Sequence, residues 1–86
     1  MDNGEFEVLA QKIVVDYISK HTLAPDGILP KFAVFTVWLS KVLQNNKGMF
    51  ACTLPDGRYF EVTYNGDKNE FYLDTYSKVS NEVIQR

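Results

Sequence analysis

The side chains that most often perform acid–base or covalent chemistry are scarce in this sequence, which has one histidine, His21, and one cysteine, Cys52. A catalytic base or nucleophile needs a partner group within hydrogen-bond reach. His21 ends a periodic apolar segment, where a cation suits the C-terminus of a helix. Cys52 alternates with Phe50 and Leu54, so we expect it to be buried as an unreactive small apolar side chain. The sequence therefore predicts no enzyme and no catalytic residue.

The sequence also lacks the residue combinations that usually bind metals or cofactors. Paired cysteines or histidines cannot form with one residue of each type. Glu61 and Glu70 could oppose one another on adjacent strands, where they would either share a cation or a proton, or remain solvated. The glycines of PDGR and YNGDK lie in turns that precede no helix, whereas a phosphate-binding loop leads into one. We expect no metal and no cofactor.

Aromatic and apolar side chains offer the clearest candidate binding chemistry, because Phe, Tyr and Trp make up 14% of the chain. The candidate binding residues are Trp38, Met49, Tyr59 and Tyr72 on one face of a predicted sheet, with Lys47 and Arg58 at its edges. Such rings are enriched at the hot spots of protein interfaces, and rings with accessible faces also stack on single-stranded bases. Alternatively, these rings pack on one another as cross-strand pairs.

Length and composition describe one small globular domain, residues 1–86. The chain is 45% hydrophobic and 23% charged, with a net charge of −2. A general binder of the phosphate backbone carries a clear basic excess, which this chain lacks. No stretch approaches the roughly 18 apolar residues of a membrane span, and the start, MDNGEFEV, is no signal segment. We therefore expect a cytoplasmic protein without membrane association.

The first predicted element is a helix over 5–21. Its apolar residues recur at spacings of three and four: Phe6, Leu9, Ala10, Ile13, Tyr17 and Ile18. Asp2, followed three residues later by Glu5, resembles a capping box. The turn residues Pro25-Asp26-Gly27 and the following Pro30 end the helical pattern.

Four strands and a second helix are expected to follow. Residues 31–43, KFAVFTVWLSKVL, are rich in β-branched and aromatic residues and are interpreted as a strand, although their apolar spacing also fits a helix. Three shorter strands are predicted over 48–54, 58–64 and 69–74. The turns between them are predicted at 44–47, 55–57 and 65–67, the last with an Asn-Gly hairpin signal. Asp74 is expected to cap a helix over 75–86.

Strict alternation along these strands predicts the two faces of the sheet. The face covered by helices would carry Phe35, Val37, Leu39, Phe50, Cys52, Leu54, Phe60, Val62, Tyr64, Phe71 and Leu73. The open face would carry Thr36, Trp38, Ser40, Met49, Ala51, Thr53, Tyr59, Glu61, Thr63, Glu70 and Tyr72. The predicted class is α+β: a four-stranded antiparallel β-meander with N- and C-terminal helices packed on one face, in the order α-β-β-β-β-α.

The chain also contains a set of short motifs: Val37-Trp38, Lys41, Leu43-Gln44-Asn45, Lys47 and Tyr64-Asn65-Gly66-Asp67-Lys68. Together with the opening segment LAQKIVVDY, they resemble a family of small phage and prophage proteins of unknown function from Gram-positive bacteria. The resemblance extends over nearly the whole chain. It implies a phage or prophage origin and the cytoplasm of a bacterial host, and it implies no activity.

Two functions are therefore compatible with the sequence. The first is a non-enzymatic module that binds a protein of the host, of the phage or of its own kind through the open face. The second is an accessory protein that binds single-stranded nucleic acid. Neither the oligomeric state nor the identity of a partner is indicated by the residues.

Overall fold

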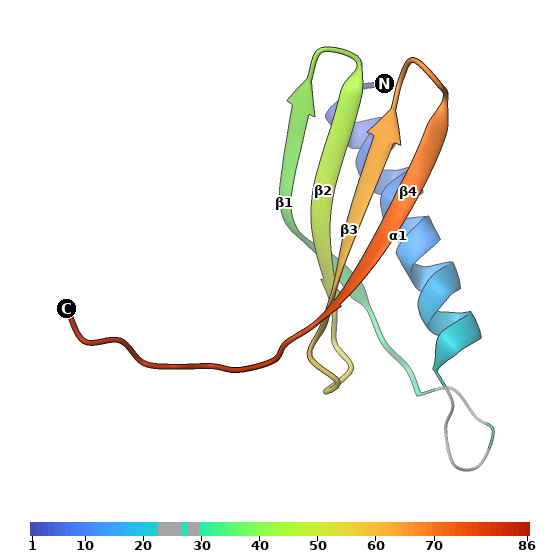
Figure 1. Cartoon of the computed structure of the whole chain (residues 1–86). Coiled ribbons are helices and arrows are strands. Elements are labelled where there is room, and N and C mark those ends of the chain that lie inside the picture. The colour runs from blue at the N-terminus through green and yellow to red at the C-terminus, as the bar shows by residue number, and fades with distance from the viewer. Residues whose placement is uncertain (23–26, 28–29) are drawn as a thin grey trace.

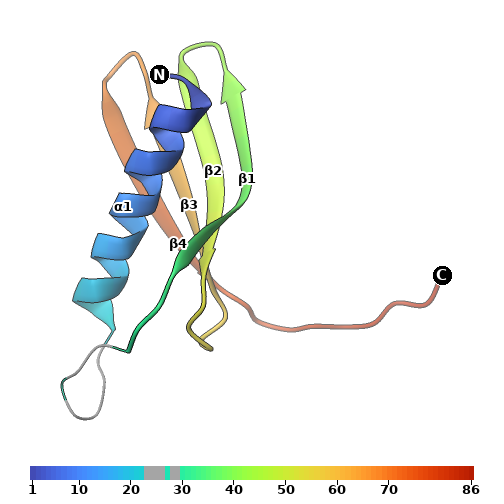
Figure 2. The same cartoon turned by 180° about the vertical axis from the view of Figure 1, so that it is seen from behind.

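The computed structural model describes residues 1–22, 27 and 30–86 of the chain. One helix, α1 (Asn3–His21), precedes four strands, β1 (Val34–Val42), β2 (Asn45–Cys52), β3 (Arg58–Asn65) and β4 (Glu70–Ser77). The strands form one antiparallel sheet in the order β1-β2-β3-β4, and α1 lies on one side of it (Figures 1 and 2). The predicted N-terminal helix and β-meander are confirmed. The predicted turn at 25–27 lies largely outside the described residues.

Helix α1 begins where the sequence predicts. The Oδ1 atom of Asp2 accepts a hydrogen bond from the backbone N–H of Glu5 at 2.7 Å, which satisfies one of the free donors of the first turn. Every fourth residue from there is fully buried, in the series Phe6, Ala10, Val14 and Ile18. This spacing makes a single apolar stripe that faces the sheet.

The core lies between this stripe and the sheet. Phe50, Phe60 and Val62 of the two central strands are fully buried against the helix. The ring of Phe6 contacts Phe50 and Phe71 with centroids 6.5 and 6.4 Å apart, so the start of α1 is held by both β2 and β4. Cys52 faces the same side, but it is only partly buried, because it ends β2 at the margin of the core. Cys52 is therefore less buried than the sequence predicts.

Strand β1 contains a β-bulge at Val37. Thr36 pairs with Phe50 of β2, and Trp38 pairs with the next residue, Met49, so Val37 has no partner of its own. An extra residue shifts the alternation of side chains by one position. The two ends of β1 therefore follow opposite parities.

The bulge turns Thr36 toward α1 and Phe35 toward the opposite face. The hydroxyl of Thr36 donates to Glu7 and accepts from the side-chain amide of Gln11 at 2.9 Å. Phe35 lies beside Ala51 and is 48% exposed. The predicted faces of Phe35 and Thr36 are therefore wrong, because strict alternation cannot anticipate a bulge.

The predicted helix over 75–86 is also wrong. Strand β4 continues to Ser77, and Tyr76 and Ser77 pair with Tyr59 and Arg58 of β3. Asp74, the expected helix cap, lies inside this strand. Pairing with β3 satisfies the backbone groups of the segment, whereas a helix of this length without a packing surface is marginal in water.

Residues 78–86, called here the C-terminal arm, form neither helix nor strand. The arm runs outward from the end of β4, away from the sheet and from α1 (Figures 1 and 2). Its apolar side chains Val79, Val83 and Ile84 are 97, 82 and 85% exposed. The arm therefore makes no contribution to the core.

The first hairpin turn is shorter than predicted. Leu43 and Gln44 form it, with Leu43 in the left-handed region at φ 55°, and β2 resumes at Asn45. The Gln44 side chain donates to Asp67 of the β3–β4 turn at 2.7 Å, and Asn45 accepts from the backbone N–H of Gly66 at 3.1 Å. The two turns at this end of the sheet are therefore joined.

Candidate functional site

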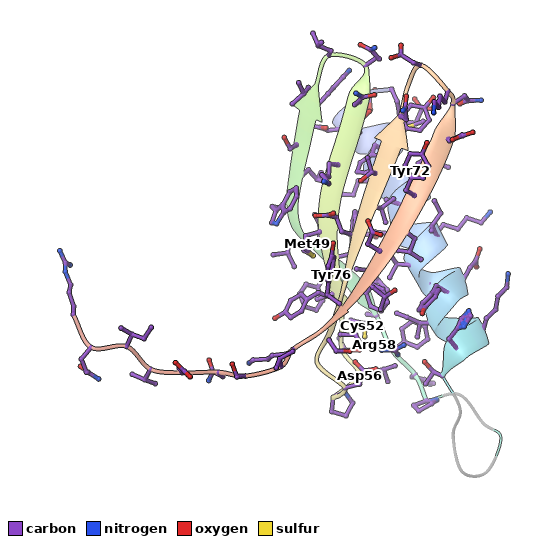
Figure 3. The ribbon with its side chains drawn as sticks, viewed as in Figure 1. Met49, Cys52, Asp56, Arg58, Tyr72 and Tyr76 are labelled. Carbon is purple, nitrogen blue, oxygen red and sulfur yellow. The ribbon has the colours of Figure 1, made fainter. Side chains whose placement is uncertain are left out.

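The open face is the side of the sheet opposite α1, and no helix or strand of the described residues covers it. Cross-strand pairing places its side chains in rows. One row crosses all four strands as Phe35, Ala51, Tyr59 and Tyr76. The next row is Trp38, Met49, Glu61 and Asp74, and the third is Ser40, Lys47, Thr63 and Tyr72. Figure 3 views the sheet from this side.

The first two rows hold an aromatic patch, defined as Phe35, Trp38, Met49, Ala51, Tyr59 and Tyr76; its four rings are exposed, and Ala51 is buried. Phe35 and Tyr76 are each 48% exposed, and Trp38 is 41% exposed. The ring pairs found among the described residues all involve side chains of α1 or of the helix-facing side, and none joins two rings of the patch. Cross-strand stacking within the patch is therefore not what occupies these rings.

Five of the six sequence-predicted binding residues lie on the open face. Trp38, Met49 and Tyr59 belong to the aromatic patch. Tyr72 and Lys47 share the third row, nearer the joined turns. The Tyr72 side chain is exposed, and its hydroxyl donates a hydrogen bond to Glu70 at 2.6 Å. This hydrogen bond to a carboxylate raises the pKa of the phenol.

Arg58, the sixth candidate, faces the α1 side instead. Its guanidinium donates to the hydroxyl of Thr22 at 3.0 Å and lies 5.6 Å from the ring centroid of Phe60. It also forms an ion pair with Asp56 at 2.6 Å. Burial raises the pKa of the Asp56 carboxyl, but the hydrogen bonds and the charge of Arg58 together outweigh it, so the pKa lies below its ordinary value. Arg58 is thus a link between the β2–β3 turn and the end of α1 (Figure 3).

The charges of the open face are mostly negative. Lys47 forms an ion pair with Glu61 at 3.3 Å. Glu61 lies directly opposite Asp74, and Asp74 takes part in no ion pair among the residues that the structure describes. Glu70 pairs with Asn65, so Glu61 and Glu70 do not oppose one another, which was one possibility in the sequence. Two like charges in register repel each other, and a cation from outside would relieve that repulsion.

A shallow pocket of about 190 Å³ lies at the end of the face where the turns join, lined by Ser40, Val42, Asn45, Asn46, Lys47 and Thr63. Asn46 is buried, and its side-chain amide donates to the backbone carbonyl of Met1 at 3.3 Å. It therefore ties β2 to the residues that precede α1. Among residues 1–22, 27 and 30–86, no group of three or more His, Cys, Asp or Glu side chains could hold a metal ion.

Two rings of the patch, Phe35 and Tyr76, are not among the binding residues predicted from the sequence. Phe35 was not predicted because strict alternation along β1, without the bulge, places it on the face covered by the helix. Tyr76 follows Tyr72 and Asp74 at a spacing of two, which is a strand signal. That signal was available in the sequence, but the apolar spacing of the C-terminal arm favoured a helix.

Comparison with known proteins gives a family and no function. No curated protein and no solved structure matches the chain. In the part of the chain that the structure describes, no helix is both long and apolar enough to cross a membrane. The sequence profile of a family of unknown function matches residues 7–86, which include α1 almost entirely, the whole sheet and the arm. The chain therefore belongs to this family of unknown function, DUF6275.

Proposed function

We propose that the protein is a non-enzymatic protein-interaction module, encoded by a phage or prophage and acting in the cytoplasm of a bacterial host. The open face of the sheet is its binding surface, and the aromatic patch is the centre of that surface. The partner is a protein of the host, of the phage, or a second copy of the chain. The Gram-positive phage origin rests on the resemblance of the sequence motifs.

The observation that carries this proposal is the uncovered aromatic patch. Rings from β1, β3 and β4 lie on one face, unpaired and each 41–48% exposed, and Met49 of β2 lies among them. Contiguous apolar surface of this kind marks interaction sites in soluble proteins. Trp and Tyr are also among the types that dominate the binding energy of protein interfaces, and Phe and Met are enriched there.

Single-stranded nucleic acid is the second candidate partner, because the same exposed rings could stack on bases. The charges of the face oppose it. Glu61, Glu70 and Asp74 outnumber Lys47, and Arg58 is engaged on the other side of the sheet. A groove that follows a phosphate backbone needs the opposite sign.

The test compares Trp38→Ala with the control Val8→Ala, which removes an exposed apolar side chain from α1. The full chain is used to capture partners from nuclease-treated and untreated lysates of the host, and captured proteins are then titrated as purified components. We expect Trp38→Ala to weaken association by about 2 kcal/mol or more and Val8→Ala to leave it unchanged.

The stability of the monomer separates binding from packing. A fully buried ring costs about 3–5 kcal/mol when removed, so a half-exposed Trp38 should cost much less. If Trp38→Ala unfolds the chain, and a stabilised background shows no loss of association, the ring serves the fold and the proposal fails. Binding that is lost with nuclease and falls steeply with salt would favour nucleic acid instead.

A further inference from the structure

We propose that the C-terminal arm of one copy of the chain packs on the open face of a second copy, in a reciprocal exchange that forms a dimer. This inference rests on the proposed function, because it names the occupant of the same face. A twofold dimer uses the same arm and the same patch on both subunits. Each copy therefore both supplies an arm and receives one.

Among the residues that the structure describes, the arm is an exposed apolar segment that lacks a surface to pack on. Val79, Val83 and Ile84 are more exposed than any ring of the patch. The spacing of four between Val79 and Val83 places both on one side of a helical turn. An arm that meets an apolar surface can therefore present these side chains together, at the cost of ordering its backbone on binding.

The geometry of the arm favours a second copy over its own sheet. Val79 is the second residue after β4, so a chain that returned to its own open face would have to reverse direction at once. The reversal would also use Val79 in the turn instead of on the sheet. The observed arm runs outward, where it can reach another molecule (Figure 2).

Charge complementarity supports the same pairing. The open face carries Glu61, Glu70 and Asp74 against Lys47, a net charge of 1 − 3 = −2. The side chains of the arm include Lys78 and Arg86 against Glu82, a net side-chain charge of 2 − 1 = +1. The facing carboxylates of Glu61 and Asp74 are the place on this surface where a cation of the arm relieves the most repulsion.

Analytical ultracentrifugation of the full chain, from about 1 μM to about 1 mM, tests the exchange with two variants. The arm variant is Val83→Asp with Ile84→Asp, and the patch variant is Trp38→Ala with Tyr59→Ala. We expect the unmodified chain to dimerise and each variant alone to dimerise about 30-fold more weakly or worse, which corresponds to about 2 kcal/mol. Val8→Asp, an exposed substitution on α1, should dimerise normally.

Mixing the two variants is the decisive measurement. Their heterodimer keeps one intact contact, the arm of the patch variant on the patch of the arm variant, whereas each homodimer keeps none. The mixture should therefore associate more tightly than either variant alone. Circular dichroism confirms that both variants are folded, and Trp38→Ala alone replaces the double patch variant if that one is not.

The remaining outcomes overturn the exchange in distinguishable ways. If the patch variant weakens association and the arm variant does not, the open face binds but the arm is not its occupant, and the proposed function survives. If only the arm variant weakens association, the arm binds elsewhere on the second copy and the exchange is wrong, while the proposed function still depends on the capture test with Trp38→Ala. A chain that stays monomeric, with slowed amide exchange over residues 78–86, would place the arm on its own sheet.

Discussion

Gly66, in the turn between β3 and β4, allows this turn to contact the turn between β1 and β2. Gly66 has no positive φ, so its turn does not need the conformational freedom of glycine. A Cβ atom at this position would lie 2.2 Å from the backbone oxygen of Gln44. Gly66 is therefore required for the close approach of the two turns. The Leu43-Gln44-Asn45 and 64–68 motifs meet at this contact, which gives both a structural role.

Gly66→Ala should destabilise the fold by about 1–3 kcal/mol, because backbone must move to make room for the methyl group. The control is Gly4→Ala in the first turn of α1, where the added Cβ meets only Asp2 at 3.4 Å. That change should be neutral or stabilising by up to about 1 kcal/mol. Urea denaturation measures both, and equal stability of the two variants would contradict the role given to Gly66.

The Asp56–Arg58 pair makes a prediction about pH. The pKa of Asp56 is lowered from its ordinary 3.8, so the unfolded chain binds this proton more readily than the folded one. The stabilisation from the pair is therefore fully present above the ordinary value and is lost as the pH falls through the folded-state value. Asp56→Asn keeps the acceptor for the backbone N–H of Arg58 and removes the charge.

We expect Asp56→Asn to cost at most about 1 kcal/mol near neutral pH, since the pair is partly exposed to solvent. The difference from the unmodified chain should be constant above the ordinary value of 3.8 and should shrink as the pH falls below it. Asp16→Asn, on the exposed side of α1, is the matched control that removes one surface carboxylate. If the difference in unfolding free energy between Asp56→Asn and the unmodified chain does not change as the pH falls, the charge of the Asp56 carboxylate does not contribute to stability.

At the level of elements, the bulge in β1 decides which side chains meet α1 and which reach the open face. Thr36→Val should destabilise the fold by about 1 kcal/mol, because the Thr36 hydroxyl bonds to both Glu7 and Gln11 of the helix. Thr63→Val, on the open face, should be close to neutral. Thermal unfolding distinguishes the two, and an equally neutral Thr36→Val would argue that Thr36 does not hold the helix.

The sequence was sufficient for most of this architecture. Helix α1 has a cap and an apolar stripe, and each strand is bounded by turn residues, so local chemistry and periodicity agree. The prediction of a C-terminal helix is wrong because it rests on the helical spacing of Tyr76, Val79 and Val83. The pairing of Tyr76 with Tyr59 is a long-range contact, which this spacing does not reveal. Tertiary pairing outweighs local preference there.

The open face was predictable to the extent that alternation holds. Trp38, Met49, Tyr59 and Tyr72 share it as expected. Arg58 was predicted at the edge of the open face because it is charged. Its position two residues before the buried Phe60 indicates the opposite face, so alternation along β3 would have placed it correctly. Phe35 could not have been found, because one unpaired residue in β1 reverses the parity of everything before it.

The whole molecule is a two-layer structure whose smallest extent is only 18 Å, with α1 covering one side of the sheet. A domain of this size has few ways to compensate for a lost core side chain. Typical stabilities per residue give a chain of 86 residues about 4–13 kcal/mol in total. A single contact between the layers can therefore decide whether the fold persists.

Phe6 is that contact. It is fully buried and joins α1 to β2 and β4 through Phe50 and Phe71. Phe6→Ala should remove about 3–5 kcal/mol of stability, which is a large part of the total, and should leave a measurable unfolded fraction at physiological temperature. Val8→Ala, two residues away and 69% exposed, should change stability by less than about 0.5 kcal/mol.

Urea denaturation followed by both tryptophan fluorescence and circular dichroism tests this cooperativity. Trp38 reports on the sheet from the open face, and the helical signal reports on α1. The two probes should give the same midpoint in the unmodified chain and the same, lower midpoint in Phe6→Ala. If α1 melts in that variant while Trp38 keeps its native signal, the sheet is stable without its helix, and the two layers do not fold as one unit.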